Sequence, residues 1–173
     1  EHLRVISIVI DESKKAKVLA GAGSNCTAEA VMLSKKAEDM GADGILSISP
    51  YYVKPTQEGI YRHYAAIEEA VNCPIMMYNV PGRTGSNMSV DTILRLAELP
   101  GIAGVKEASG IMSQIQNIIL GRPKDFSVLS GDDALTMPLM SLGADGVISV
   151  ASNCCPAMVS EMVRNAHSGN FDV

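Results

Sequence analysis

The sequence predicts an α/β protein whose parallel strands, each followed by a helix, form part of a (β/α)8 TIM barrel. Short apolar runs alternate with helical stretches of about ten or more residues. The apolar runs are continuous, as in strands that are buried on both faces, and they do not alternate with polar residues. The strands recur every 20 to 30 residues, a period that is typical of parallel sheets.

About six strands are expected, at Ala16–Ala20, Gly44–Ser49, Pro74–Asn79, Ala103–Lys106, Ser127–Ser130 and Gly146–Ala151. Helices with apolar residues at three- and four-residue spacing lie between them. Two examples are Ala28–Asp39, with Thr27 as its expected N-cap, and Val90–Leu99, with Ser89 as its expected N-cap.

One segment of the chain repeats. Residues 41–49 (GADGILSIS) resemble residues 143–151 (GADGVISVA), and in both a helix ends on Gly before a buried strand. The repeat supports one unit of strand and helix that recurs along the chain.

A doubly wound sheet that binds a dinucleotide has the same alternation, but two observations favour the barrel. The segment Gly21-Ala-Gly23-Ser-Asn25 lacks the third glycine of the Gly-x-Gly-x-x-Gly loop. Unusual polar residues follow nearly every strand, as the active sites of barrels require. Because a barrel needs eight strands, residues 1–173 are expected to be the central part of one barrel domain, without its first strands and its C-terminal helical region.

Charge and hydropathy exclude two classes of partner. The net charge is −5, the isoelectric point is about 5.1, and the longest basic run is Lys14-Lys15. Neither a nucleic-acid surface nor a polybasic membrane patch is expected. No apolar run reaches the roughly 18 residues that a membrane helix needs.

Cysteine and histidine positions argue against disulfides and metal. The four cysteines form no CxxC pair and are expected to be reduced, buried thiols in a cytoplasmic protein: Cys26, Cys73, Cys154 and Cys155. The three histidines fall at scattered helical positions, so that no metal site is expected: His2, His63 and His167.

Lys106 is the sharpest chemical signal. It ends the buried run that begins at Gly101, so that its side chain is expected to point into the mouth of the barrel. Desolvation there would lower its pKa and favour the neutral amine, which can attack a ketone and form an imine. The alternative is a lysine that reaches water and pairs with Glu107.

Tyr78 ends the preceding strand, where its phenol could relay protons beside Lys106. The alternative is a packed tyrosine whose hydroxyl is satisfied. Arg83 follows in a tight Pro-Gly turn, and its guanidinium suits bidentate binding of a carboxylate. The alternative is a surface salt bridge.

Two further strand ends carry polar or aromatic pairs. Tyr51 and Tyr52 suggest a substrate wall or a subunit contact. Asp132 and Asp133 argue against phosphate binding, and they could also cap the following helix.

Together these segments resemble the dihydrodipicolinate synthase / N-acetylneuraminate lyase family across nearly the whole chain. The matching blocks are residues 21–25 (GAGSN), 50–59 (PYYVKPTQEG), 78–85 (YNVPGRTG), 104–109 (GVKEAS), 130–133 (SGDD) and 146–150 (GVISV). The resemblance implies a lyase without a cofactor that joins pyruvate to L-aspartate 4-semialdehyde, in lysine and diaminopimelate biosynthesis. It also implies a homotetramer that is a dimer of dimers.

The resemblance assigns a role to each site residue. Lys106 would form the Schiff base with pyruvate, Tyr78 would relay protons, and Tyr52 would reach into the neighbouring subunit's site. The remaining assignments are Arg83 for the carboxylate of the aldehyde, Gly131 and Ile148 for the pyruvate pocket, and Asn25, Glu29 and Tyr51 for a lysine effector site at the dimer interface.

One departure and two rivals remain. The family's pair of threonines, which completes the proton relay, would lie before residue 1. The first rival is a related pyruvate-dependent aldolase for a 2-keto-3-deoxy sugar acid or sialic acid, and the arginine in the Val-Pro-Gly-Arg-Thr turn at Arg83 speaks against it. The second rival is a non-catalytic barrel fragment.

Overall fold

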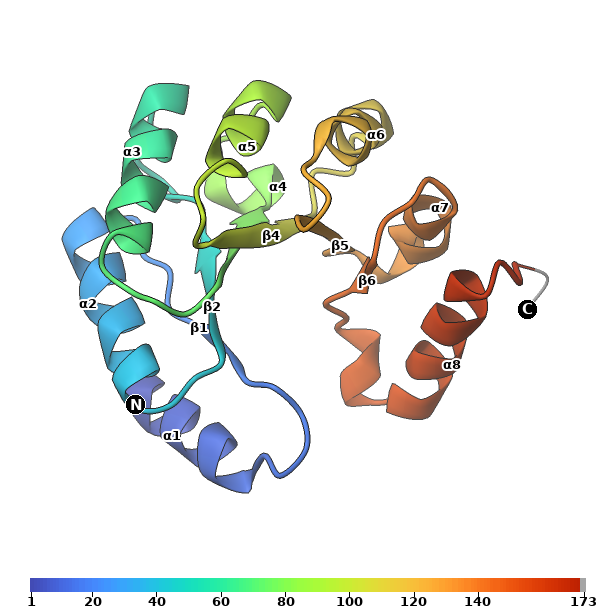
Figure 1. Ribbon diagram of the computed structural model, residues 1–173, viewed down its shortest axis with the longest axis horizontal. Helices are drawn as coiled ribbons and strands as arrows, with labels where there is room; N and C mark the ends of the chain where they lie inside the picture. Colours follow the sequence, from blue (N-terminus) through green and yellow to red (C-terminus); the bar gives the residue numbers. More distant parts are fainter. Residues whose placement is uncertain (172–173) are drawn as a thin grey trace.

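The computed structural model describes residues 1–171 and contains one six-stranded parallel sheet with helices along its outer face (Figure 1). The strands, in sheet order, are β1 (Leu19–Gly21), β2 (Gly44–Ile48), β3 (Ile75–Asn79), β4 (Ile102–Glu107), β5 (Ser127–Ser130) and β6 (Gly146–Val147). Each strand pairs with its neighbours in sequence, whereas a doubly wound sheet reverses its order at a switch point. The predicted incomplete barrel is therefore confirmed.

The helices lie between the strands in sequence. They are α1 (His2–Glu12), α2 (Thr27–Asp39), α3 (Gln57–Glu68), α4 (Pro81–Thr84), α5 (Val90–Leu96), α6 (Met112–Gly121), α7 (Thr136–Ser141) and α8 (Pro156–His167), with 3-10 turns η1 (Asp133–Leu135) and η2 (Ala151–Asn153). A helix expected to begin within residues 169–173 lies partly outside the described residues. No helix in the described part of the chain is long and apolar enough to span a membrane.

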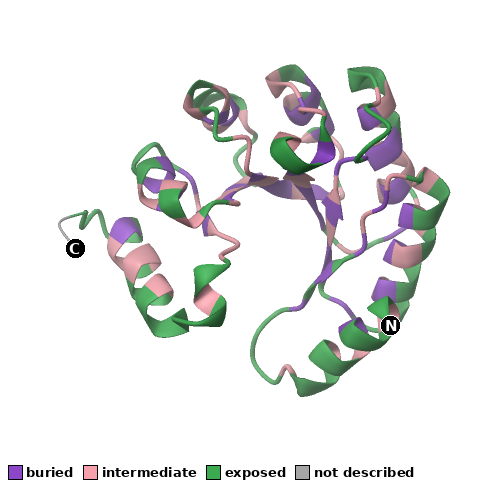
Figure 2. Ribbon diagram, turned by 180° about the vertical axis from the view of Figure 1, so that it is seen from behind, coloured by how far each residue is buried: buried purple, intermediate pink, exposed green. Residues whose placement is uncertain are grey.

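The core lies between the sheet and the helices (Figure 2). Side chains of a strand point alternately to its two faces. On β3, Ile75 and Met77 are fully buried and belong to this core, whereas Tyr78 between Met77 and Asn79 is half-buried and faces the lumen of the curled sheet. On β4 the same alternation directs Val105 into the core and Lys106 towards the lumen. Tyr78 and Lys106, which face the lumen, are therefore only half-buried.

Three expected boundaries need correction. The N-cap of α2 is Cys26, and Thr27 is the first helical residue because its hydroxyl oxygen lies 2.9 Å from Nδ1 of His63. The expected strand at residues 16–20 begins only at Leu19, after an exposed segment. The expected strand at residues 146–151 ends at Val147 because the chain turns into η2. The Ser89 N-cap is confirmed, since its hydroxyl oxygen accepts from the Thr92 amide at 3.2 Å.

The prediction that the cysteines are buried is wrong. All four thiols are free of disulfides, but Cys26, Cys154 and Cys155 are exposed and Cys73 is half-buried.

The aspartate of the repeated segment makes the same kind of hydrogen bond in both copies, at the N-terminal end of the sheet. Asp43 accepts a hydrogen bond from the backbone amide of Val18 at 2.8 Å, just before β1. Asp145 accepts one from the amide of Val128 at 2.8 Å, within β5. Each aspartate thus ties its own strand to the preceding strand. The N-terminal face of a barrel commonly serves stability in this way.

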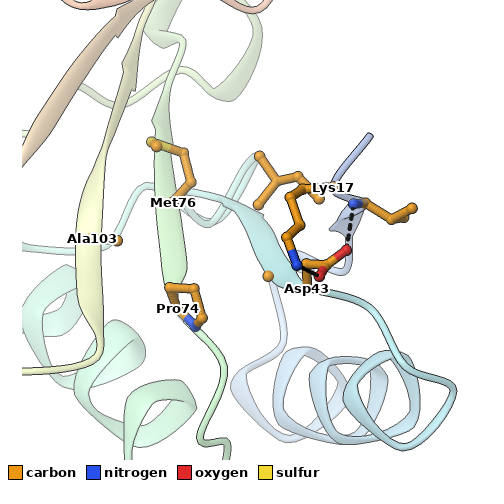
Figure 3. A pocket seen from close by; sticks show the side chains of 8 residues that line it. Lys17, Asp43, Pro74, Met76 and Ala103 are labelled. Atoms are coloured by element: carbon orange, nitrogen blue, oxygen red, sulfur yellow. Dashed lines mark hydrogen bonds and ion pairs between the residues drawn. The ribbon is translucent and has the colours of Figure 1, made fainter. Parts of the chain in front are cut away.

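Lys17 completes the first of these ties by pairing with Asp43 at 2.6 Å (Figure 3). A cavity of about 360 Å³ lies beside this pair, and Figure 3 shows Pro74, Met76 and Ala103 along it. Its lining is mostly apolar and lies near the N-terminal ends of the strands. Because barrel enzymes react at the opposite, C-terminal end, the site is sought there.

Candidate active site

Lys106 and Tyr78 face each other across β3 and β4. The two residues are register partners in the parallel pair, and both side chains point into the lumen. The Nζ atom of Lys106 lies 4.1 Å from the centroid of the Tyr78 ring. The structure therefore brings together the amine and the phenol that the sequence placed at adjacent strand ends.

The surroundings of Lys106 favour its neutral form. Burial lowers the pKa of the Lys106 ammonium, and the negative charge of Asp133 partly opposes this shift. Burial raises the pKa of the Tyr78 phenol, while the positive charge of Arg83 acts in the opposite direction. A less basic lysine beside a protonated phenol is the combination that imine formation needs.

Glu107 is not the partner of Lys106. Its carboxylate points to the other face of the sheet, where it is 1% exposed and accepts hydrogen bonds from Asn79 and the Ser109 amide. The alternative of a solvent-seeking Lys106–Glu107 pair is therefore wrong. Strand alternation explains this result, because neighbouring side chains on a strand face opposite sides.

Gly131 gives the Lys106 side chain its space. A Cβ atom at Gly131 would lie 3.1 Å from Cε and 3.2 Å from Cγ of Lys106. It would also lie 2.8 Å from the Cβ atom of Ala108. The structure thus places Gly131 directly against the stem of Lys106, where any larger residue would displace it.

Asp132 and Asp133 differ in role. Asp132 accepts from the amide of Ala134 at 2.9 Å and caps η1, which agrees with the capping alternative. Asp133 instead accepts from the amides of Val150 and Ala151, each at 3.0 Å. These two hydrogen bonds hold the start of η2, where the chain has left strand β6.

Asp133 was missed as a site residue, although it is the one acidic group whose charge acts on the pKa of Lys106. Its position directly after β5, one strand from Lys106, was the available signal. Ile148, expected in the pyruvate pocket, follows β6, and its amide donates to the carbonyl of Ser130 at 2.9 Å. It therefore lies at the same end of the sheet as Lys106.

The mouth of the curled sheet holds a second cavity, of about 670 Å³. It is lined by Tyr51, Tyr52, Lys54, Gly82, Arg83, Thr84 and Gly85. The loop after β2 and the turn after β3 form it together, since the amide of Tyr52 donates to the carbonyl of Thr84 at 3.0 Å. Two basic residues, Lys54 and Arg83, belong to its lining, and such side chains can bind an anionic group.

The turn that carries the exposed Arg83 is fixed by its own hydrogen bonds. The turn that carries it ends on Gly85 in the left-handed conformation (φ 76°), and the buried Thr84 hydroxyl donates to the carbonyl of Ser86 at 2.8 Å. Among the residues that the structure describes, no ion pair includes Arg83. The salt-bridge alternative for Arg83 is therefore not what the structure shows.

Tyr52 is exposed, and no contact with Lys106 is found among the described residues. Its side chain is 86% exposed, and its backbone has φ 70° in a three-residue turn that the Val53 amide closes on the carbonyl of Tyr51 at 2.8 Å. Such a conformation is strained for a bulky residue and is typical of functional segments. The structure therefore does not bring Tyr52 to Lys106 within one chain.

The expected effector residues are only partly gathered. Asn25 and Glu29 lie at the start of α2, where Glu29 accepts from the Ser24 hydroxyl at 2.5 Å. Tyr51 lies in the loop after β2, and no hydrogen bond within residues 1–171 joins it to Asn25 or Glu29. Their assignment to a lysine site stays a prediction.

The histidines are engaged in single structural contacts. Nε2 of His2 lies 2.5 Å from the carbonyl of Gly21, and Nε2 of His167 lies 3.0 Å from that of Asp145. Within the described part of the chain, no group of three or more His, Cys, Asp or Glu residues is placed to hold a metal ion.

Known proteins resemble this chain over its full length. The Dihydrodipicolinate synthetase family matches residues 1–173. A 4-hydroxy-tetrahydrodipicolinate synthase of Chlorobium phaeovibrioides is 56% identical over 174 residues, which are 99% of this chain and 59% of that protein. The chain thus spans about three fifths of the length of this relative.

Solved structures agree with the sequence match. The crystal structure of dihydrodipicolinate synthase from Aquifex aeolicus superposes with a TM-score of 0.96 at 47% identity, over 99% of this chain and 59% of that one. The enzyme of Acinetobacter baumannii, solved as a complex with pyruvate, gives 0.95 at 46% identity over 99% and 59%. The half-closed sheet, the lysine and tyrosine at its centre and these matches together show that the chain belongs to the dihydrodipicolinate synthetase family.

Proposed function

We propose that the protein carrying this chain condenses pyruvate with L-aspartate 4-semialdehyde through a Schiff base on Lys106. The observation that carries the proposal is the placement of the half-buried Lys106 amine 4.1 Å from the Tyr78 ring, at the C-terminal end of the strands. The name of the Chlorobium relative and the pyruvate complex of the Acinetobacter enzyme support it.

The first half of the reaction uses Lys106 and Tyr78. The neutral amine attacks the carbonyl carbon of pyruvate, and the resulting carbinolamine loses water to give the imine. The departing hydroxyl needs a proton, which the Tyr78 phenol can donate because burial keeps it protonated. The imine formed in this way is protonated, and the Tyr78 phenolate can take a proton from its methyl carbon, which restores the phenol and gives a neutral enamine, the carbon nucleophile.

The second half uses the cavity at the mouth. The enamine attacks the aldehyde carbon of aspartate semialdehyde, and hydrolysis of the new imine releases the product from Lys106. Arg83 has no ion-pair partner among the described residues, so its guanidinium is available for the carboxylate of the aldehyde. A neutral sugar aldehyde needs no guanidinium here, which ranks the sugar-acid aldolase second.

Trapping of the imine tests the proposal. The protein expressed from its complete natural reading frame is treated with pyruvate and borohydride, and the modified peptide is identified by mass spectrometry. The expected label lies on the peptide with Lys106 and disappears in Lys106→Ala. Lys124→Ala, which changes an exposed lysine in a turn, should label normally. A label on another lysine would contradict the assignment, and no label at all would favour the non-catalytic fragment.

Arg83→Ala separates the two aldehyde classes. A charged hydrogen bond contributes about 1.5–3 kcal/mol, so that the variant should lose at least roughly tenfold in kcat/KM for aspartate semialdehyde. Imine formation with pyruvate should persist. Arg62→Ala, which removes an exposed arginine paired with Glu58, serves as the control. Unchanged turnover of aspartate semialdehyde in Arg83→Ala would point to the sugar-acid rival.

Subunit pairing and lysine binding belong to the same proposal. The exposed, strained Tyr52 suits insertion into a neighbouring subunit's site within a dimer of dimers. Loss of turnover in Tyr52→Phe without a change in assembly would support that role. A lysine effector would act through Asn25, Glu29 and Tyr51, and Glu29→Gln should then weaken inhibition by lysine.

A further inference from the structure

A second pair of residues lies directly behind Lys106 and Tyr78. Asn79 and Glu107 follow them on β3 and β4 and are register partners in the same way. Their side chains face the helices, where Asn79 is 0% and Glu107 is 1% exposed. Nδ2 of Asn79 donates to Oε2 of Glu107 at 2.9 Å. Two neighbouring contacts thus join β3 and β4: Lys106 with Tyr78 on the lumen face, and Asn79 with Glu107 on the helix face.

The buried pair is fully satisfied in this arrangement. Nδ2 of Asn79 also donates to Oδ1 of Asn87 at 2.8 Å, and its Oδ1 accepts from the Met88 amide at 3.1 Å. The other carboxylate oxygen of Glu107 accepts from the Ser109 amide at 2.6 Å. Leaving any of these buried groups unpaired would destabilise the fold, because a buried polar group without a partner keeps its full desolvation cost. The network therefore favours the one strand register that satisfies all of its members.

The register of this strand pair is irregular at one point, although the ladder between β4 and β5 is regular. The β3–β4 ladder contains an irregularity between Ile75 and Met76, where the partner shifts from Ile102 to Gly104 and skips Ala103. A slip by one residue turns every following side chain to the other face of a sheet. After this bulge, a slip of β4 would move Lys106 out of the lumen and Glu107 into it.

We propose that the Asn79–Glu107 hydrogen bond fixes the register of β3 and β4 beyond the bulge and thereby positions Lys106 against Tyr78. The inference rests on the proposed function and adds two positioning residues to it. Neither side chain reaches the lumen, so they act through Lys106 and not on the substrate. Burial also raises the pKa of Glu107, and the charge that acts on the pKa of Lys106 is that of Asp133.

The experiment exchanges the donor and the acceptor in the intact protein. Asn79→Asp places two acceptors face to face, so that the bond forms only when one carboxyl is protonated. The double variant Asn79→Asp/Glu107→Gln restores a donor and an acceptor with their positions reversed. Glu107→Gln alone keeps an acceptor for Asn79 and serves as the mild variant. The maximal rate of imine formation with pyruvate, its pH midpoint and thermal unfolding are measured for each.

We expect Asn79→Asp to lose at least roughly tenfold in the maximal rate of imine formation, with a midpoint at higher pH because Lys106 becomes more solvated. The double variant should regain most of the rate and the original midpoint. A lower unfolding temperature in Asn79→Asp with an unchanged rate and midpoint would show a merely structural role and would overturn the proposal. Failure of the double variant to recover, while folded, would also overturn it.

A second variant covers the case in which Asn79→Asp does not fold. A labelling measurement tests the positioning of Lys106 without relying on the proposed function. If Asn79→Asp does not fold, Asn79→Ala, which removes the donor to Glu107 without adding a charge, must show a shift of the midpoint in the same direction, and no shift refutes the inference. Competitive acetylation with acetic anhydride reports the pKa and reactivity of Lys106 without any substrate. A change there in Asn79→Asp would support positioning even if the unmodified protein formed no imine with pyruvate, which would refute only the proposed function.

Discussion

Replacing Gly131 by alanine tests whether the space beside Lys106 matters for its reactivity. The added Cβ atom would lie 3.1 Å from Cε and 3.2 Å from Cγ of Lys106, whereas ordinary contacts lie at 3.4–4 Å. The lysine stem is the flexible partner, so that it must shift by a few tenths of an ångström. Gly131 does not adopt a positive φ, so that alanine imposes no backbone strain there.

The size of the effect follows from this displacement. Overpacking a close-packed site costs roughly 1–3 kcal/mol of stability. A misplacement of about 1 Å in a reacting group costs about 10²-fold in rate, so that a few tenths of an ångström should cost roughly threefold to tenfold. The assay is the rate of borohydride-trapped imine formation at saturating pyruvate, measured well below the unfolding temperature.

A double variant separates the two contacts of the new methyl group. Ala108→Gly removes the shortest contact, at 2.8 Å, and leaves those to Lys106 unchanged. Ala108→Gly/Gly131→Ala should therefore regain stability and keep the slow imine formation. If Gly131→Ala forms the imine at the normal rate, the lysine does not depend on this space and the reasoning is refuted.

Three further results are expected. Asp133→Asn should shift the pH midpoint of imine formation downwards, because the Asp133 charge raises the pKa of Lys106; an unchanged midpoint would contradict this coupling. Burial lowers the pKa of His63 from 6.5 to about 4, a difference that corresponds to about 3 kcal/mol. Stability should therefore fall as the pH drops from about 6.5 to about 4, and His63→Gln should flatten the unfolding free energy over that window. Ser89→Ala should lower the unfolding free energy by about 1 kcal/mol in denaturant titrations, because α5 loses its cap.

The positions of Lys106 and Tyr78 could be predicted because they depend on local pattern. A continuous apolar run marks a buried strand, and parallel strands end at the same edge of a sheet. The sequence also contained the signal that separates Lys106 from Glu107, namely the alternation of side chains along a strand. Adjacency alone suggested an ion pair, and the fold placed the two groups on opposite faces.

The errors occur where a distant residue decides a local boundary. Thr27 has the right chemistry for an N-cap, but its hydroxyl contacts His63, which lies 36 residues away. The strand after Gly146 ends early because Asp133, 17 residues earlier, binds the amide of Val150. Neither contact leaves a trace in local composition or periodicity.

Charged side chains are compensated by partners at the N-terminal end of the sheet and are less compensated at the C-terminal end. At the N-terminal end, Asp43 and Asp145 each bind a backbone amide and a basic side chain, so that their charges are compensated. At the C-terminal end, Lys106 lies partly desolvated against an aromatic ring, and Arg83 lacks an ion-pair partner among the described residues. A group that is desolvated without compensation costs stability, and folding alone gives no reason to bury Lys106 in part at this end, beside a turn that carries the exposed Arg83. Under the proposed function, an anionic substrate would pair with the Arg83 guanidinium at this end, whereas the stabilising ties of Asp43 and Asp145 lie at the other.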